Sequence, residues 1–320
     1  MNPVSAAIRE DFEAVNRLVV ASLHSEVGLV ESIGHYIVEG GGKRLRPLIA
    51  LLSARALGYA GTAHVEFATV IEFLHTATLL HDDVVDVSHL RRGRATANAN
   101  WGNAPSVLVG DFIYSRAFQL LVGLGDMRLL RLIADTTNQI AEGEVEQLAR
   151  AGDPATTEAQ YMGVIHKKTA VLFAAAAEGG ALLAGADASV CDVMRQFGTN
   201  LGLAFQIIDD ALDYEGDAAQ MGKNAGDDLA EGKPTLPLIH AIAHAAPVDA
   251  ECVRAAIRCR DGSRLQPVLS IIRANGSLAY THAAARRHRD LALAALIRLP
   301  MSDFRANLEA LAMLAVARDC

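Results

Sequence analysis

Apolar residues recur at the three- and four-residue spacing of amphipathic helices along most of the chain, and no segment shows convincing two-residue alternation. The helical stretches are separated by segments rich in Gly, Pro, Asn or Asp, which favour turns. These breaks fall at 39–47, 57–63, 91–105, 150–157, 183–189, 214–237 and 244–249. The stretches between them are long enough for roughly ten helices of typical length. The pattern therefore predicts an all-α protein.

The composition supports one large helical domain. The chain has 320 residues, 51% of them hydrophobic, and its richness in Ala and Leu favours helices throughout. A length above 300 residues could mean two domains, but no Pro/Ser-rich linker or shift in composition divides the sequence. We therefore expect a single domain over residues 1–320.

The most apolar segment, Ala170 to Ala186, contains Glu178 and three glycines. A membrane-spanning helix needs about 20 clean apolar residues, so this segment predicts a buried helix pair or a kinked helix. The N-terminus carries acids early and lacks a basic region followed by an apolar stretch, so no signal peptide is expected. The four cysteines show no CxxC spacing, which argues against a zinc site or a disulfide framework and favours a reduced, cytoplasmic protein.

Two similar groups of aspartates each follow an apolar run. "LLHDDVVD" carries Asp82, Asp83 and Asp86, and "AFQIIDDALDY" repeats the i, i+1, i+4 spacing. On a helix, each group projects from one side. A solvated face would explain one such group, but Glu would serve that purpose better in a helix, so two Asp groups favour a function. Asp oxygens suit Mg²⁺, which commonly binds one or two carboxylates together with substrate phosphates. Two such faces, opposed across a cavity, would hold several Mg²⁺ ions and a diphosphate.

Basic residues lie close to the same elements. In "GGGKRLRP" (40–47), glycine N–H groups and neighbouring cations could bind phosphate, although a basic turn before a helix is an equal alternative. It is not a P-loop, because Arg44 stands where Ser or Thr is required. In "RRGRATAN" (91–98), Arg91 and Arg92 could neutralise the first acidic face or bind a phosphate that the metals also hold, and we favour the phosphate. The net charge of −8 argues against a general nucleic-acid surface.

Other polar residues align with these faces. His75 shares a helix face with Asp82, and Gln206 shares one with Asp210 and Asp213. Lys168 and Thr169 offer a cation and a hydroxyl before the apolar segment. Lys223 and Lys233 bracket two acids in the loop after the second motif, which fits an ion-paired lid or a loop that closes on phosphate. Each has an ordinary structural alternative. Alternate glutamates in "AEGEVEQL" (141–148) cannot all face one site and are interpreted mainly as a solvated face.

Taken together and in this order, these motifs resemble those of the trans-type polyprenyl diphosphate synthases, most closely the bacterial octaprenyl diphosphate synthases. The similarity extends from about residue 25 to the C-terminus, and the paired DDxxD motifs make it specific. It implies an isoprenoid synthase-like fold of mostly antiparallel helices around a central cavity, and a cytoplasmic homodimer. It also implies elongation of an allylic diphosphate, expected to be farnesyl diphosphate, with isopentenyl diphosphate, to give octaprenyl diphosphate for the side chain of a respiratory quinone. No transmembrane segment and no nucleic acid are implied, but product release could involve transient membrane contact.

The resemblance assigns roles to individual residues. It makes Asp82, Asp86 and Asp209 the ligands of two or three Mg²⁺ ions, supported by Asp83, Asp210 and Asp213, and it counts Lys168 with the three ligands as catalytic. The positions that match isopentenyl diphosphate-binding residues are Lys43, Arg46, His75 and Arg92. The positions that match allylic diphosphate-binding residues are Arg91, Lys168, Thr169, Gln206, Lys223 and Lys233.

Product length depends on what lies beneath the metals. Thr78 and Ala77 precede Asp82 by four and five residues, about one helical turn. Short-chain relatives commonly carry an aromatic residue there, so Ala77 favours a long product. Three alternatives remain open: a synthase for geranylgeranyl or nonaprenyl diphosphate, a terpene cyclase, and a non-catalytic partner subunit. A cyclase needs no second diphosphate site, and partner subunits typically lose motif residues that this chain keeps.

Overall fold

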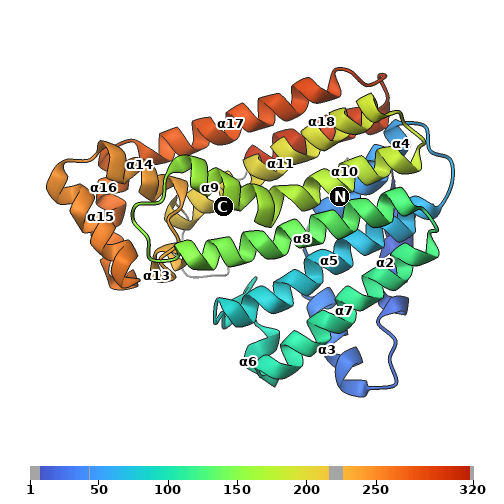
Figure 1. Ribbon diagram of the computed structural model, residues 1–320, viewed down its shortest axis with the longest axis horizontal. Helices are drawn as coiled ribbons and strands as arrows, with labels where there is room; N and C mark the ends of the chain where they lie inside the picture. Colours follow the sequence, from blue (N-terminus) through green and yellow to red (C-terminus); the bar gives the residue numbers. More distant parts are fainter. Residues whose placement is uncertain (1–7, 43, 216–225, 318–320) are drawn as a thin grey trace. The chain divides into compact units, whose positions relative to one another are not determined.

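The computed structural model describes residues 8–42, 44–215 and 226–317, and most of these residues are helical (Figure 1). The predicted all-α class is confirmed. Short helices such as α6 (Ala97–Trp101) and α13 (Asp227–Ala230) lie inside segments that the sequence marked as breaks, so the helices outnumber the ten or so that were predicted.

The chain forms two compact units. Unit 1 comprises Met1–Thr137, Leu172–Gly198 and Ala294–Leu311, and unit 2 comprises Asn138–Val171, Thr199–Leu293 and Ala312–Cys320. Among the described residues, five helices contribute to both units: α8 (Met127–Arg150), α10 (Val171–Leu183), α11 (Ala188–Glu215), α17 (Ser277–Leu296) and α18 (Asp303–Val316). The single domain over 1–320 stays a prediction.

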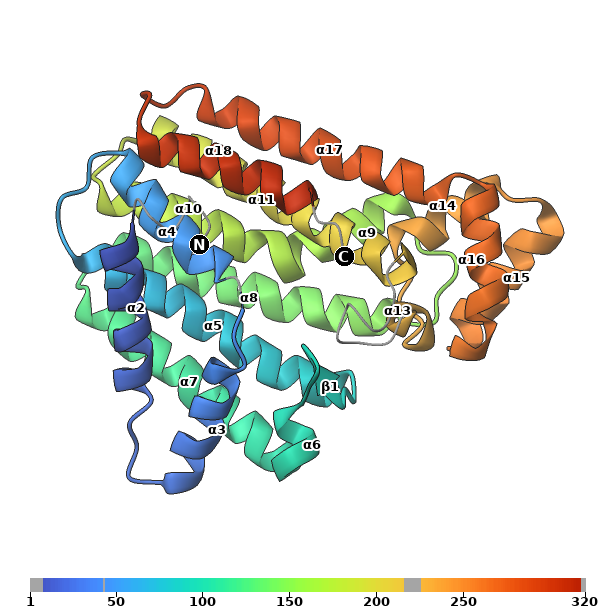
Figure 2. The same ribbon diagram turned by 180° about the vertical axis from the view of Figure 1, so that it is seen from behind.

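Unit 1 is organised around one long buried helix. Its elements are α2 (Arg9–Ser22), α3 (Gly28–Glu39), α4 (Leu45–Ala56), α5 (Ala63–Val85), α6 and α7 (Asn103–Gly123), with parts of α8 (Met127–Arg150), α10 (Val171–Leu183), α11 (Ala188–Glu215) and α18 (Asp303–Val316). Both views show α5 lying alongside α7 (Figure 2). Phe67, Phe73 and Leu80 of α5 are fully buried, as expected for a helix that is apolar on most of its faces.

A small hairpin follows α5 and was missed in the sequence. Strands β1 (Leu90–Arg91) and β2 (Arg94–Ala95) pair antiparallel, with Arg91 opposite Arg94. The two turn residues, Arg92 and Gly93, have φ of 52° and 72°. Positive φ at both positions is the signature of a type I′ turn, which fits the twist of a two-residue hairpin. The strands are too short to show alternation, so only the Gly could have indicated the turn.

Unit 2 contains two apolar clusters. Its elements are α9 (Glu158–Ile165), the π-helical turn η1 (His166–Ala170), α13, α14 (Leu236–His244), α15 (Pro247–Cys259), the 3₁₀ turn η2 (Gly262–Arg264), α16 (Leu265–Ala274) and most of α17 (Ser277–Leu296), with the later parts of α8 and α11. One cluster lies around Ile257 and Ile272. The other lies around Ile165 and Ile207, and it holds α9, η1 and α11 together.

The apolar segment 170–186 forms the end of η1 and the mostly buried helix α10. The burial agrees with the prediction, but the segment forms one helix where a helix pair or a kinked helix was predicted. Within the described ranges, no helix is both long enough and apolar enough to cross a membrane.

Candidate active site

The first Asp motif lies at the C-terminal end of α5. Asp82 and Asp83 are in its last turn, and the backbone N–H of Asp86, the C-cap residue, donates to the carbonyl of Asp82 at 2.8 Å. Asp82 and Asp86 are partly exposed, whereas Asp83 is fully buried. The last turn contains no basic residue. Because a helix C-terminus carries partial negative charge, three acids there favour a bound cation.

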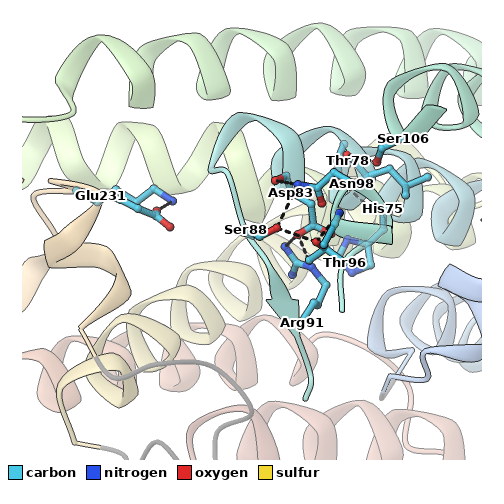
Figure 3. A network of polar contacts seen from close by, with 12 residues as sticks. His75, Thr78, Asp83, Ser88, Arg91, Thr96, Asn98, Ser106 and Glu231 are labelled. Carbon is cyan, nitrogen blue, oxygen red and sulfur yellow. Dashed lines mark hydrogen bonds and ion pairs between the residues drawn. The ribbon is translucent and has the colours of Figure 1, made fainter. Parts of the chain in front are cut away.

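Asp83 anchors the hairpin. Arg91 donates to Asp83 Oδ1 from Nε at 2.8 Å and approaches it with Nη2 at 2.7 Å. The Asn98 amide donates to the carbonyls of Asp83 and Ser88, both at 3.1 Å. Figure 3 shows these residues gathered where the hairpin leaves α5. Of the two roles weighed for Arg91, the ion pair with the acidic motif is the one observed, and a role in binding diphosphate stays a prediction.

A cluster of cations surrounds Glu72, three residues before His75 on α5. Arg44 Nε lies 3.7 Å from Glu72 Oε1. Burial raises the pKa of Glu72, and the charges of Arg44, Arg46 and Arg92 oppose that rise. Burial also lowers the pKa of Arg92, and the neighbouring positive charge of Arg91 adds to this effect. Cations packed this closely around one acid leave a positive local potential suited to an anion.

His75 and Arg46 contact each other directly. Arg46 Nη1 donates to His75 Nε2 at 3.2 Å, because a guanidinium cannot accept, and its Cζ lies 4.4 Å from the centroid of the Phe173 ring. Burial, followed by the charge of Arg46, holds the pKa of His75 well below its ordinary value. His75 is therefore neutral at neutral pH, and its proton lies on Nδ1.

The backbone that carries these residues is unusual. Arg44, Val87 and Arg92 have φ of 44°, 53° and 52°, a region that non-glycine residues adopt uncommonly. Gly42, with φ of 152°, lies against Arg92: a Cβ added there would fall 2.6 Å from Arg92 Nη1. The backbone of the GGGKRLRP segment thus lies against the guanidinium of Arg92. Lys43 lies outside the described residues.

The second Asp motif ends α11 in unit 2. Asp209 is partly exposed, Asp210 is 4% exposed and Asp213 is fully buried. Tyr161 Oη donates to Asp210 Oδ2 at 2.6 Å, and Gln206 Nε2 donates to Asp210 Oδ1 at 2.8 Å. Burial raises the pKa of Asp210 well above its ordinary value. Asp213 Oδ2 accepts from the backbone N–H of Asp228 at 3.2 Å, which ties α13 to the motif.

Lys168 and Thr169 lie in the π-helical turn η1. Thr169 Oγ1 donates to Gln206 Oε1 at 2.8 Å, and Lys168 Nζ contacts Glu144 Oε2 at 2.6 Å. Gly143 of α8 makes this approach possible, because a Cβ there would lie 2.8 Å from the backbone nitrogen of Lys168. π-helical turns inside α-helices occur frequently at functional sites. The structure thus links Thr169, Gln206 and Asp210 by hydrogen bonds, and Lys168 precedes Thr169 in the same turn.

The interpretation of the glutamates in 141–148 as a solvated face is wrong for two of them. Glu144 and Glu146 are partly buried, and Glu146 Oε2 contacts Lys167 Nζ at 3.0 Å. Glu142 is exposed, as expected. Glu146 also pairs with Arg150, four residues further along the same helix. Lys168 and Lys167, which pair with Glu144 and Glu146, are more than twenty residues away, so helical spacing alone could not reveal these two contacts. Glu72 and Tyr161 were missed for the same reason.

The remaining predicted site residues are Lys233, Lys223, Ala77 and Thr78. Lys233 is partly buried and paired with Glu231, and Lys223 lies outside the described residues. Ala77 has no exposed surface. Thr78 is partly exposed, and its hydroxyl donates to the carbonyl of His75 at 2.9 Å.

The carboxylates suit a hard cation. Among the described residues, no three His, Cys, Asp or Glu side chains are arranged to hold a metal by themselves. Asp82, Asp86 and Asp209 offer only oxygen ligands, and each is partly exposed. Asp82 and Asp86 lie at the negative end of α5, and Asp209 lies six residues before the end of α11. This donor set fits Mg²⁺, which keeps waters and shares its coordination with substrate phosphates.

Comparison with known proteins agrees with this chemistry. The family model for polyprenyl synthetase matches residues 27–274. The chain is 52% identical over 320 residues to the octaprenyl diphosphate synthase of Escherichia coli (strain K12), which covers 100% of this chain and 99% of the relative. It is 47% identical over 316 residues to the all-trans-nonaprenyl-diphosphate synthase (geranyl-diphosphate specific) of Rhodobacter capsulatus, covering 98% and 97% of the two chains.

A solved structure is similarly close. The polyprenyl synthase from Caulobacter crescentus CB15, complexed with calcium and isoprenyl diphosphate, matches with a TM-score of 0.95 and 45% identity, over 98% of this chain and 97% of that one. Both Asp motifs and the basic clusters lie within the parts of the chain that these relatives and this structure match. The chain belongs to the polyprenyl synthetase family and is a prenyltransferase.

Proposed function

We propose that this prenyltransferase elongates farnesyl diphosphate with successive isopentenyl diphosphate units to all-trans octaprenyl diphosphate, the precursor of a respiratory quinone side chain. The relative named an octaprenyl diphosphate synthase supports this product, since it is 52% identical over its whole length. The observation that carries the reaction type is that each unit has its own polar cluster next to an acidic helix end: Arg46 and His75 in unit 1, and Lys168 and Thr169 in unit 2. Two diphosphate substrates require two such clusters.

In the proposed assignment, Lys43, Arg46, His75 and Arg92 bind isopentenyl diphosphate. Neutral His75 accepts from Arg46 and so orients that guanidinium, a group that binds phosphate oxygens well. Gly42 and the positive φ of Arg92 fix the second guanidinium. These contacts would hold the isopentenyl double bond in place without taking part in bond breaking.

The allylic diphosphate is assigned to Arg91, Lys168, Thr169, Gln206, Lys223 and Lys233, with Asp82, Asp86 and Asp209 as ligands of two or three Mg²⁺ ions. Bound Mg²⁺ would neutralise the charge that develops on the departing diphosphate. Lys168, held by Glu144, would stabilise the same charge. The allylic C–O bond breaks, the isopentenyl double bond attacks the resulting carbocation, and the proton lost from the adduct passes to the released pyrophosphate.

Within the enzyme class, a nonaprenyl product is the main alternative, because a relative of that name is 47% identical. A geranylgeranyl product is disfavoured by Ala77, which leaves α5 without an aromatic side chain at that position. A terpene cyclase would need only one of the two clusters. A non-catalytic subunit would need neither the paired Asp motifs nor the cations beside them.

Incubation with farnesyl diphosphate, labelled isopentenyl diphosphate and Mg²⁺, followed by chromatography of the dephosphorylated products, tests the proposal. We expect a ladder that ends at eight isoprene units. A ladder ending at nine or at four would correct the product. A cyclic hydrocarbon, or no elongation that depends on Mg²⁺, would overturn the reaction.

A homodimer is supported by one face of α7. Leu108 and Val122 are 66% and 64% exposed, and a shallow hollow of about 620 Å³ is lined by Tyr114, Ser115, Phe118, Gln119 and Val122. An apolar stripe of this kind on a helix marks an interaction surface. Light scattering should give a dimer for the wild type and a monomer for Val122→Glu. Val248→Glu, at an 82% exposed position on α15, is the matched control and should stay dimeric.

We place the enzyme in the cytoplasm, with transient membrane contact at product release, because the product is a long hydrocarbon. Flotation with lipid vesicles should recover more protein after elongation than before it. Equal recovery in both cases would remove the membrane step.

A further inference from the structure

Tyr161 links α9 to the second Asp motif. Its side chain is 4% exposed, and its ring lies in the apolar cluster that holds α9, η1 and α11 together. Its hydroxyl donates to Asp210 Oδ2 at 2.6 Å, and Asp210 is itself 4% exposed. A short hydrogen bond to a buried carboxylate fixes the orientation of that carboxylate.

Asp210 is the end point of a longer chain of hydrogen bonds. Gln206 Nε2 donates to Asp210 Oδ1 at 2.8 Å, and Gln206 Oε1 accepts from Thr169 Oγ1 at 2.8 Å. The Gln206 amide therefore presents its NH₂ group to Asp210 and its oxygen to Thr169. The orientation of Asp210 therefore determines how both Gln206 and Thr169 present their polar atoms.

Both carboxylate oxygens of Asp210 are thus occupied by donors from the protein. Tyr161 supplies one of the two donors, and Gln206 cannot replace it without losing its own bond to Oδ1. Without the tyrosine hydroxyl, a buried Oδ2 would lack its donor, and rotation of the carboxylate would disturb Gln206 and Thr169. The partly exposed Asp209 is adjacent on the same helical turn.

We propose that Tyr161 is a positioning residue for the allylic diphosphate, acting through Asp210 on Gln206 and Thr169. This inference rests on the proposed function, in which those two residues bind that substrate. Tyr161 itself touches neither substrate nor metal in this assignment.

The test compares Tyr161→Phe with Tyr280→Phe. Tyr280 is a matched control, because its hydroxyl also donates to a carboxylate, Glu158, at 2.8 Å, in the same unit. For Tyr161→Phe we expect the KM for farnesyl diphosphate and the Mg²⁺ concentration at half-maximal rate each to rise about tenfold, the effect of losing one buried hydrogen bond. The KM for isopentenyl diphosphate should stay unchanged, and Tyr280→Phe should change none of these quantities.

A double-mutant cycle of Tyr161→Phe with Asp210→Asn tests whether Tyr161 acts through Asp210. If Tyr161 acts through Asp210, the double variant should be no worse than Asp210→Asn alone. Additive effects would overturn the proposal. So would a Tyr161→Phe protein that fails to fold by circular dichroism, since the phenylalanine ring preserves the apolar packing and the loss would then be structural.

A readout without turnover separates this inference from the proposed function. Mg²⁺ with inorganic pyrophosphate should raise the Tm of the wild type and of Tyr280→Phe, and raise that of Tyr161→Phe less. A wild type that elongates no allylic diphosphate would contradict the proposed function. A wild type that elongates normally, together with a Tyr161→Phe variant indistinguishable from Tyr280→Phe, would contradict only the role of Tyr161.

Discussion

Arg91 and Asp83 form an ion pair in which the carboxylate is fully buried and the guanidinium is about one-third exposed, with Nη2 2.7 Å from Oδ1. The pair joins the end of α5 to the hairpin that carries Arg92. Asp83→Asn should therefore lower the free energy of unfolding by about 1–2 kcal/mol, the range for a charged hydrogen bond with one partly solvated partner. Urea denaturation measures this change.

Asp126→Asn is the control for that experiment, because Asp126 pairs with Arg128 at the same 2.7 Å distance but with a guanidinium that is 57% exposed. Surface pairs contribute little, so its effect should stay below about 1 kcal/mol. Equal losses for the two variants would show that burial does not strengthen the Asp83 pair.

His75 should make stability depend on pH. Burial lowers its pKa in the folded protein below the ordinary value of about 6.5. Below about pH 6.5, the unfolded chain binds a proton that the folded chain does not, so stability falls as the pH falls. His75→Gln keeps an acceptor for Arg46 but removes this titration. Between about pH 7 and pH 5, the wild type should lose more unfolding free energy than His75→Gln. Parallel pH profiles would contradict a buried neutral His75.

The sequence could predict the parts of the site that depend on spacing along one helix. It could not predict the parts that depend on contacts between residues far apart in the chain. Asp82 and Asp86 share a helical face, and helical spacing is a local property, so their placement at one helix end could be read directly. Glu144 and Tyr161 find their partners 24 and 49 residues away, through the packing of different helices. No local pattern encodes such pairings. The hairpin was missed because its four strand residues are too few to show a period.

Ala77 should control product length. Ala77→Phe should shorten the longest product by at least one isoprene unit, because an aromatic ring one turn below Asp82 would obstruct the growing chain. Since Ala77 is fully buried, the larger side chain should also cost about 1–3 kcal/mol of stability. Chromatography of the dephosphorylated products gives the length.

Leu79→Phe places a similar ring two residues further along α5, on another face of the helix, and is the control for Ala77→Phe. Its product should remain the length of the wild-type product. If both variants shorten the product equally, the effect is one of general repacking, and if neither does, Ala77 does not border the path of the chain.

Asp82 should show that the acidic helix end serves function at the expense of stability. Asp82→Ala removes a carboxylate from the negative end of α5. Its Tm should therefore equal or slightly exceed that of the wild type, which corresponds to a gain of at most about 0.3–1 kcal/mol in the free energy of unfolding. Its turnover should fall by orders of magnitude, because one of the assigned Mg²⁺ ligands is gone. Glu66→Ala, in the first turn of the same helix, removes a carboxylate from the positive end and should lower the Tm slightly without changing turnover. The opposite signs of the two Tm shifts make the pair of variants diagnostic. Turnover like that of the wild type in Asp82→Ala would remove it from the metal site, and a lower Tm would show that the carboxylate is needed for folding instead.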